Sequence, residues 1–225
     1  MWCRRLVDDG ADANRTVLHG LDDDIHPVDL AGCRVGIRSY TVTTVTWARA
    51  ILQMQYDVDI DEVTWVAHED SHVAEFQDPP NVERIDLAGR TLEQFLVDGL
   101  IDAAVLAAPP ADPRIRPLIP DPSAAAQEWY DRFGGIQINH MVVVDTALSA
   151  ERPDVVRELY AMLLRGKRLA PRTELGIDVL PFGVEANRRN LALAIECAAA
   201  QRLIPHRVEV DSLFDETTRA LEQAA

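Results

Sequence analysis

Short apolar runs alternate with amphipathic segments along the first half of the chain. Apolar runs at 34–37, 63–67 and 103–107 predict buried strands, and the apolar periodicity between them predicts helices up to about Gln55 and at 91–98. Gly99 follows the second of these helices, at the position where glycine commonly caps a helix end. Because strands that alternate with helices form a parallel sheet, the pattern predicts an α/β fold.

The remaining segments are less regular. Residues 1–30 are Asp-rich with weak periodicity, and we interpret them as a lead-in. Pro109–Pro122 holds six of the thirteen prolines, which favours an extended crossing segment over a helix. The pattern then predicts a short helix at 124–133, a strand at 138–144 and amphipathic helices at 154–168 and 184–200. A strand or turn at 207–214 would precede a last short helix.

Composition narrows the classes of function. The formal charge is −15 over 225 residues, so the overall field repels nucleic-acid backbones and anionic lipid surfaces. No stretch approaches the roughly 20 apolar residues of a membrane span, and no signal-peptide run is present. The three cysteines are scattered without metal-type spacing, which favours a reducing cytoplasm.

A first group of candidate site residues lies where the strand at 34–37 ends. An arginine, a tyrosine and several hydroxyl side chains precede a predicted helix, whose first N–H groups and dipole favour an anion. Arginine adds a planar donor that fits a carboxylate. The alternative is an ordinary helix start beside a solvated arginine. The residues of this group are Arg38, Ser39, Tyr40, Thr41, Thr43 and Thr44.

A second group follows the strand at 63–67. Residues 68–72 read His-Glu-Asp-Ser-His, which formally matches the zinc-protease pattern H-E-x-x-H. Pro79 and Pro80 would cut such a helix short, and no third metal ligand is evident, so we do not interpret the motif as a zinc site. We interpret four of the polar residues here as a rim at the carboxyl end of a parallel strand, with an exposed charged helix start as the alternative: Glu69, Asp70, His72 and Glu75.

Two further features lie in the second half of the chain. Asn139 and His140 interrupt the apolar run at 138–144, so they are expected to be hydrogen-bonded or to face a cavity. A structural role for His140 is the alternative. The charged residues at 185–190 open a predicted helix, and we interpret them as a solvated first turn.

Several stretches together resemble the 4,5-dihydroxyphthalate decarboxylase family, whose members share the two-lobed fold of type II periplasmic binding proteins. The similarity is collinear over roughly residues 28–215, and the combination is more specific than any one piece. The stretches are Asp29-Leu-Ala-Gly-Cys-Arg-Val-Gly-Ile-Arg-Ser-Tyr-Thr, Trp47-Ala-Arg-Ala-Ile-Leu, Thr64-Trp-Val, Glu69-Asp-Ser-His-Val-Ala-Glu, Ile138-Asn-His-Met-Val-Val-Val and Leu180-Pro-Phe-Gly-Val-Glu-Ala-Asn.

The resemblance implies a division of the chain. Residues 1–33 would be the lead-in and a remnant of lobe one, 34–137 would be lobe two, and 138–225 would be the returning part of lobe one with C-terminal helices. The family pattern has a longer stretch before the Asp-Leu-Ala-Gly motif than this sequence has, so we expect lobe one to be incomplete at its N-terminal side.

The resemblance also implies a function, a carboxy-lyase that releases CO2 from a hydroxylated aromatic dicarboxylate without a cofactor or metal. Substrate carboxylates would be bound by the residues of the first group and Asn139, and the proton donor would be His72 or His140, tuned by Glu69 or Asp70. The alternative is a non-catalytic solute-binding protein for a small organic anion. We expect a small aromatic carboxylate as partner, neither nucleic acid nor membrane, and leave a homo-oligomer open.

Overall fold

The structure is a computed structural model that describes residues 18–20, 26–169 and 178–221. Two compact units divide the chain: one holds the described residues up to Arg132, and the other begins at Phe133. We call them the N-terminal and the C-terminal unit and describe each by itself. No helix in the described ranges is both long and apolar enough to cross a membrane. The division into lobes stays a prediction.

A six-stranded sheet forms the centre of the N-terminal unit, in the order β4-β3-β2-β5-β1-β6. Strands β2, β3, β4 and β5 run parallel, and β1 pairs antiparallel with both β5 and β6. The predicted α/β class is therefore confirmed. The strands are β1 (Leu18–Gly20), β2 (Arg34–Ile37), β3 (Thr64–Ala67), β4 (Val82–Arg84), β5 (Ala103–Val105) and β6 (Arg116–Pro117).

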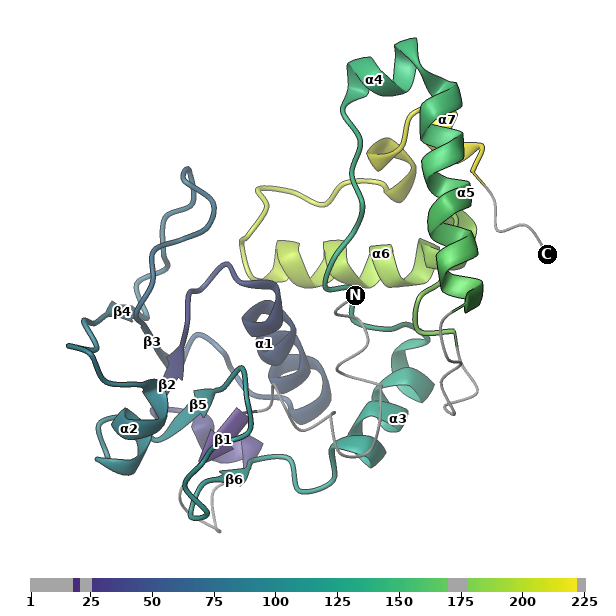
Figure 1. Ribbon diagram of the computed structural model, residues 1–225. Coiled ribbons are helices and arrows are strands. Elements are labelled where there is room, and N and C mark those ends of the chain that lie inside the picture. Colours follow the sequence, from purple (N-terminus) through teal and green to yellow (C-terminus); the bar gives the residue numbers. More distant parts are fainter. Residues whose placement is uncertain (1–17, 21–25, 170–177, 222–225) are drawn as a thin grey trace. The chain divides into compact units, whose positions relative to one another are not determined.

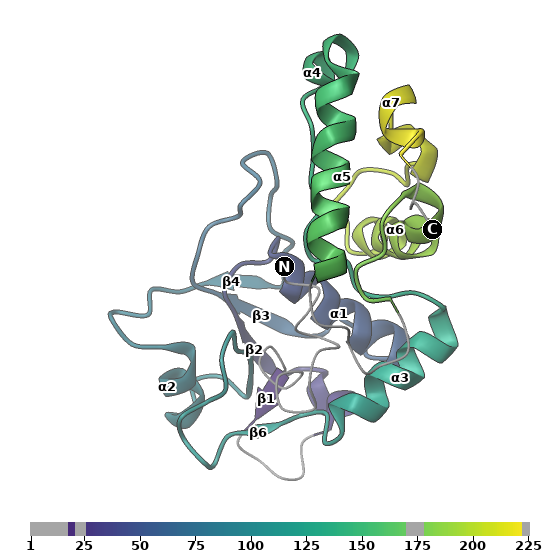
Figure 2. The ribbon, with the colours of Figure 1, turned by 45° about the vertical axis from the view of Figure 1, so that its right-hand side comes forward.

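Helices cover both faces of this sheet. α1 (Thr43–Tyr56) connects β2 to β3 and α2 (Leu92–Val97) connects β4 to β5, and they lie on opposite sides of the sheet (Figures 1 and 2). The core of the α2 side contains Val66, Leu96 and Ile101. Gly36 leaves room for Ile101 there: a Cβ atom at this position would lie 2.6 Å from the Ile101 Cδ1 atom, so the Ile101 side chain would have to shift.

Local sequence signals explain these helix ends. Thr91 accepts a hydrogen bond from the Gln94 N–H group, and the Gln94 side chain accepts one from the Thr91 N–H group, which forms a capping box at the start of α2. Asp57 caps the C-terminal end of α1: it adopts a left-handed conformation (φ 55°) and donates its N–H group to the Leu52 carbonyl. A short 3-10 helix, η3 (Pro27–Leu30), precedes β2, and α3 (Pro122–Phe133) follows β6.

The regular elements of the C-terminal unit, among its described residues, are all helices. The unit contains α4 (Thr146–Glu151), α5 (Pro153–Leu169), α6 (Val184–Ala200), η4 (Val210–Leu213) and α7 (Glu216–Arg219). Its small core joins Val184 and Leu191 of α6 to Val210 of η4, with Ile138 and Phe214 packed against them. The strand predicted at 138–144 is wrong: these residues follow an extended path to α4 (Figure 1) but form no strand, because a strand requires a partner for its backbone groups.

Candidate functional site

The loops that follow β2 and β3 are joined by their backbones. Ile37 and Ala67 are paired at the end of the parallel ladder, so Arg38 and His68 leave the sheet side by side. The Arg38 carbonyl accepts hydrogen bonds from the N–H groups of His68 (3.3 Å) and Glu69 (2.8 Å). The two groups of residues that the sequence singles out in this unit therefore share one edge of the sheet, where open α/β sheets commonly bind ligands.

Buried side chains hold these two loops together. Ser39 is fully buried, and its hydroxyl donates to the Asp70 carbonyl at 2.9 Å. The Thr41 hydroxyl accepts a hydrogen bond from the His72 N–H group at 3.0 Å. The Tyr40 ring is also buried, stacked against Phe76 at 5.9 Å. These contacts fix the path of both loops. The charged side chains of the same loops lie at the surface.

Tyr40 is further fixed by a buried cation. The Arg49 guanidinium lies over the Tyr40 ring, 3.6 Å from its centre, and donates to the Tyr40 carbonyl at 2.9 Å. Burial lowers the pKa of Arg49 to about 10, which still leaves it charged at neutral pH. A cation held over an aromatic face is attracted by the ring quadrupole, so Tyr40 acts as part of the frame under the site.

Arg38, Glu69 and His72 form a charged cluster on this frame. Arg38 Nε donates to Glu69 Oε2 at 2.7 Å, and His72 Nε2 lies 3.5 Å from the same carboxylate oxygen. The hydrogen bond from Arg38 lowers the pKa of Glu69, and the bond from His72 acts in the same direction. Glu69 therefore stays ionised at neutral pH and can hold both an arginine donor and an imidazole beside the sheet edge.

His68 is less exposed than His72. It is partly buried, and burial lowers its pKa. The segment 68–76 is a loop, so the two histidines do not have the one-helix-face geometry that the zinc motif requires. Among the described residues, no group of three or more His, Cys, Asp or Glu side chains is arranged to hold a metal ion.

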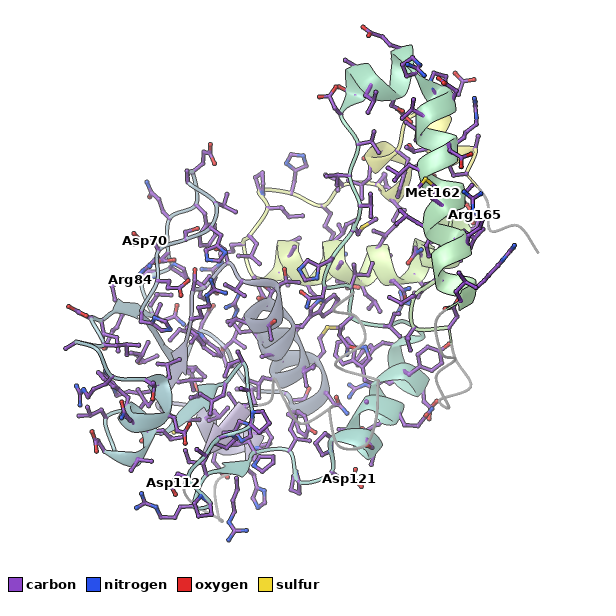
Figure 3. The ribbon with its side chains drawn as sticks, viewed as in Figure 1. Asp70, Arg84, Asp112, Asp121, Met162 and Arg165 are labelled. Atoms are coloured by element: carbon purple, nitrogen blue, oxygen red, sulfur yellow. The ribbon has the colours of Figure 1, made fainter. Side chains whose placement is uncertain are left out.

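Arg84, at the end of β4, also belongs to this edge, and the sequence did not predict it. Arg84 donates to the Glu69 carbonyl, forms an ion pair with Asp78 at 2.5 Å and lies 3.3 Å from an oxygen of Asp70. Figure 3 shows Asp70 and Arg84 near each other at the end of the sheet. The Asp70 side chain is otherwise fully exposed. Arg84 therefore anchors the loop that carries Glu69 and His72.

Thr43 and Thr44 form the first turn of α1, directly after the Arg38–Thr41 turn. The N-cap residue, Val42, provides no side-chain acceptor for the first N–H groups of the helix. Both threonines are partly buried. The positive end of the helix dipole therefore adds to the Arg38 charge on this side of the unit.

Asn139 and His140 belong to the C-terminal unit. They lie in the extended segment before α4, where Asn139 is partly buried and His140 is exposed. Their contribution to a site with Arg38 stays a prediction. Asn190, also in this unit, is buried and accepts a hydrogen bond from the Ile136 N–H group at 2.9 Å, which holds the start of the extended segment against α6.

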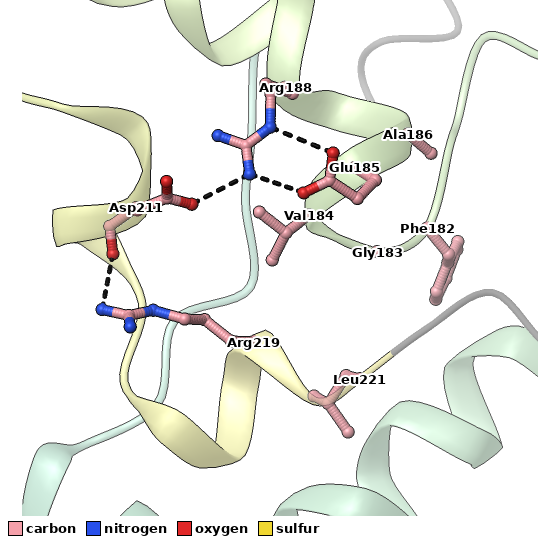
Figure 4. Close-up of a pocket in the computed structure, with 9 residues that line it drawn as sticks. All are labelled: Phe182, Gly183, Val184, Glu185, Ala186, Arg188, Asp211, Arg219 and Leu221. Atoms are coloured by element: carbon pink, nitrogen blue, oxygen red, sulfur yellow. Dashed lines mark hydrogen bonds and ion pairs between the residues drawn. The ribbon is translucent and has the colours of Figure 1, made fainter.

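A pocket of about 460 Å³ opens at the N-terminus of α6 (Figure 4). Arg188 crosses one side of it and binds Glu185 at 2.5 Å and Asp211 at 2.9 Å. Arg219 donates to the Asp211 backbone carbonyl. Hydrogen bonds to Arg188 lower the pKa of both carboxyl groups. The residues that we interpreted as a solvated first turn therefore include a bridge between α6 and η4, and Phe182 and Leu221 supply apolar lining.

Together, the fold and the sheet edge define an α/β protein with a cluster of paired charged side chains at the carboxyl ends of its parallel strands. Two curated proteins, both named 4,5-dihydroxyphthalate decarboxylase, are similar to the chain. The protein from Comamonas testosteroni is 31% identical over 144 residues, which cover 56% of this chain and 42% of the relative. The protein from Pseudomonas putida is 27% identical over 119 residues, which cover 45% of this chain and 44% of the relative.

These similarities confirm the predicted resemblance to this family. The matched regions span less than half the length of either relative. No protein-family model matches the chain.

Proposed function

We propose that the chain acts in the decarboxylation of a hydroxylated aromatic dicarboxylate of the 4,5-dihydroxyphthalate type. The observation that carries this proposal is the Arg38–Glu69–His72 cluster, in which one carboxylate holds a guanidinium donor and an imidazole at the same sheet edge. The similarity to two proteins named 4,5-dihydroxyphthalate decarboxylase supports it. The combination matches the needs of the reaction, which are a cation for carboxylates and a proton donor close by.

Arg38 would bind a substrate carboxylate. Within the described residues, the Arg38 guanidinium contacts Glu69 through its Nε atom alone. Its two terminal amino groups are therefore available for a paired interaction with an anion. The helix start at Thr43 and Thr44 would add partial positive charge. Glu69 would keep the guanidinium plane oriented before the ligand arrives, which reduces the entropy lost on binding.

His72 would supply the proton. A hydroxyl para to the leaving carboxylate pushes electrons into the ring, and the carboxyl-bearing carbon takes the proton of a protonated His72. The carbon–carbon bond to the carboxylate then breaks, CO2 leaves, and the bonding electrons restore the aromatic ring. His72 regains a proton from solvent, so one proton enters and one CO2 leaves in each turnover.

The test is to incubate the purified chain with 4,5-dihydroxyphthalate and to follow CO2 and 3,4-dihydroxybenzoate. Loss of a general acid commonly costs about 10² to 10⁴ in rate, so His72→Gln should abolish most turnover and leave binding within a few fold. His206→Gln, at an exposed histidine of the C-terminal unit, is the matched control and should retain activity.

Other outcomes separate the alternatives. Loss of turnover in His140→Gln but not in His72→Gln would move the proton donor to the C-terminal unit. Tight binding of the dicarboxylate without any CO2 release by the unaltered chain would contradict the carboxy-lyase and support a solute-binding protein.

A further inference from the structure

Arg84 links the loop that follows β3 to β4, a third strand at the same edge of the sheet. It is paired with Ala67 at the end of the parallel ladder, so it leaves the sheet beside the start of this loop. Its guanidinium contacts the loop in two directions. Nε donates to an Asp78 carboxylate oxygen at 2.6 Å and Nη2 lies 2.5 Å from the same oxygen, whereas Nη1 donates to the Glu69 carbonyl.

The contacts of Arg84 differ in what they contribute. Asp70, whose oxygen lies 3.3 Å from Nη1, has a fully exposed side chain, and a pair this exposed adds little. The Asp78 side chain is only 17% exposed, so its ion pair holds the guanidinium firmly. Because the guanidinium is planar and rigid, fixing the Nε side at Asp78 also fixes the direction of Nη1 toward the Glu69 carbonyl.

The backbone of Glu69 is therefore held on both sides. Its N–H group donates to the Arg38 carbonyl at 2.8 Å, and its carbonyl accepts from Arg84. With the peptide groups before and after Glu69 both fixed, the starting point of its side chain is fixed too. This side chain accepts from Arg38 Nε at 2.7 Å and lies 3.5 Å from His72 Nε2. Arg84 thus bears on both groups through the Glu69 backbone.

We propose that Arg84 is a positioning residue for the decarboxylation: it holds the Glu69 carbonyl so that the Glu69 carboxylate keeps Arg38 and His72 in place. This inference rests on the proposed function, because it assigns a role in the same reaction. Misplacing a reacting group by about 1 Å can lower a rate by about 10²-fold. Loss of the contact between Arg84 and the Glu69 carbonyl should therefore lower kcat much more than it changes KM.

Two variants of the full chain separate positioning from stability. Arg84→Lys keeps a cation for Asp78, so the Tm should stay within about 2 °C of that of the unaltered chain. A point charge does not reproduce the second donor edge of a guanidinium, so the Glu69 carbonyl loses its donor. The kcat for 4,5-dihydroxyphthalate should fall at least about tenfold, with KM changed by no more than a few fold.

Asp78→Asn is the matched control. Its amide oxygen still accepts from Arg84, so the contact with the Glu69 carbonyl is kept, but the charge of the anchor is lost. The Tm should fall by about 3–6 °C, while kcat stays near that of the unaltered chain. A purely structural Arg84 would give the reverse pattern, in which kcat follows the Tm in both variants, and this result would overturn the proposal.

Hydrogen exchange gives a readout that does not need turnover. The Glu69 amide should exchange several-fold faster in Arg84→Lys, whereas the Ile85 amide, which donates to the Ala67 carbonyl at 3.0 Å, should keep its rate because the ladder is intact. An unchanged Glu69 rate would overturn the proposal. The two possible failures are distinguishable: an unaltered chain that releases no CO2 contradicts the proposed function, whereas equal turnover by the unaltered chain and Arg84→Lys contradicts only the role of Arg84.

Discussion

Replacing Arg38 by alanine separates ligand binding from folding. Arg38 and Glu69 are joined at 2.7 Å, with 55% and 38% of their side chains exposed. An ion pair this exposed contributes about 0–1 kcal/mol to folding. For a chain of this size 1 kcal/mol changes the Tm by about 2–4 °C, so the Tm of Arg38→Ala should fall by less than about 4 °C.

The loss of binding should be larger than the loss of stability. Removing the cation from a desolvated carboxylate costs about 2–5 kcal/mol, and the exposure of Arg38 places the expected loss at the lower end of this range. Because 1.4 kcal/mol is one decade, affinity for a phthalate-type dicarboxylate should fall at least about tenfold. Arg38→Lys should restore only part of it, since a point charge does not reproduce the planar donor.

Calorimetric titration of phthalate into the variants measures these losses. Arg34→Ala is the matched control: Arg34 lies at the other end of β2 and pairs with Glu83 at the same distance, 2.7 Å. Its affinity for phthalate should equal that of the unaltered chain. The pKa of Glu69, followed by NMR, should rise in Arg38→Ala because its strongest hydrogen bond is lost. Unchanged affinity in Arg38→Ala would refute the site, and a collapsed melt would make Arg38 a structural residue.

Three further predictions concern stability. Arg84→Met should lower the free energy of unfolding, measured in urea, by about 1–3 kcal/mol, because it leaves the largely buried Asp78 carboxylate without its cation. The control is Arg165→Met, which removes the exposed ion pair with Glu158 and should cost less than about 0.5 kcal/mol. Gly36→Ala should cost about 1–3 kcal/mol by the same measurement, because the new methyl group would overlap Ile101. Burial lowers the pKa of His19, so His19 of the unfolded chain binds a proton at a higher pH than His19 of the folded chain does. The free energy of unfolding should therefore decrease as the pH falls from about 7 to about 5. This decrease should be smaller in His19→Gln than in the unaltered chain.

The longer elements could be predicted from the sequence because their signals are local. The helices at 91–98 and 184–200 were predicted to within a residue or two of α2 and α6. The short strands β1, β4 and β6 were missed, since two or three residues show no periodicity and their pairing depends on strands elsewhere in the chain. α4 was missed although Asp145 caps it with bonds to the N–H groups of Ala147 and Leu148, a signal that the sequence does contain.

The site follows the same division between local and distant signals. Arg38 and Glu69 could be placed together because residues that follow neighbouring parallel strands share an edge. Arg84 could not, because the pairing of β4 with β3 leaves no pattern in a segment of three residues next to Pro79 and Pro80. The bridge from Arg188 to Asp211 joins residues 23 positions apart, a pairing that charge patterns along one helix do not reveal.

Replacing Ser39 should lower stability as well as affinity, whereas replacing Arg38 should lower mainly affinity. The comparison tests whether Ser39 holds the loops of the site in place. Its hydroxyl is buried and already donates to the Asp70 carbonyl, so it holds the two loops in place and is not exposed to a ligand. Ser39→Ala should therefore lower the free energy of unfolding by about 1 kcal/mol and weaken phthalate binding through a looser loop, so that both quantities fall together. Urea unfolding and calorimetry on the same preparation measure the two effects. A variant that lost affinity with full stability would show that Ser39 contacts the ligand directly, and the frame would have to be assigned to other residues.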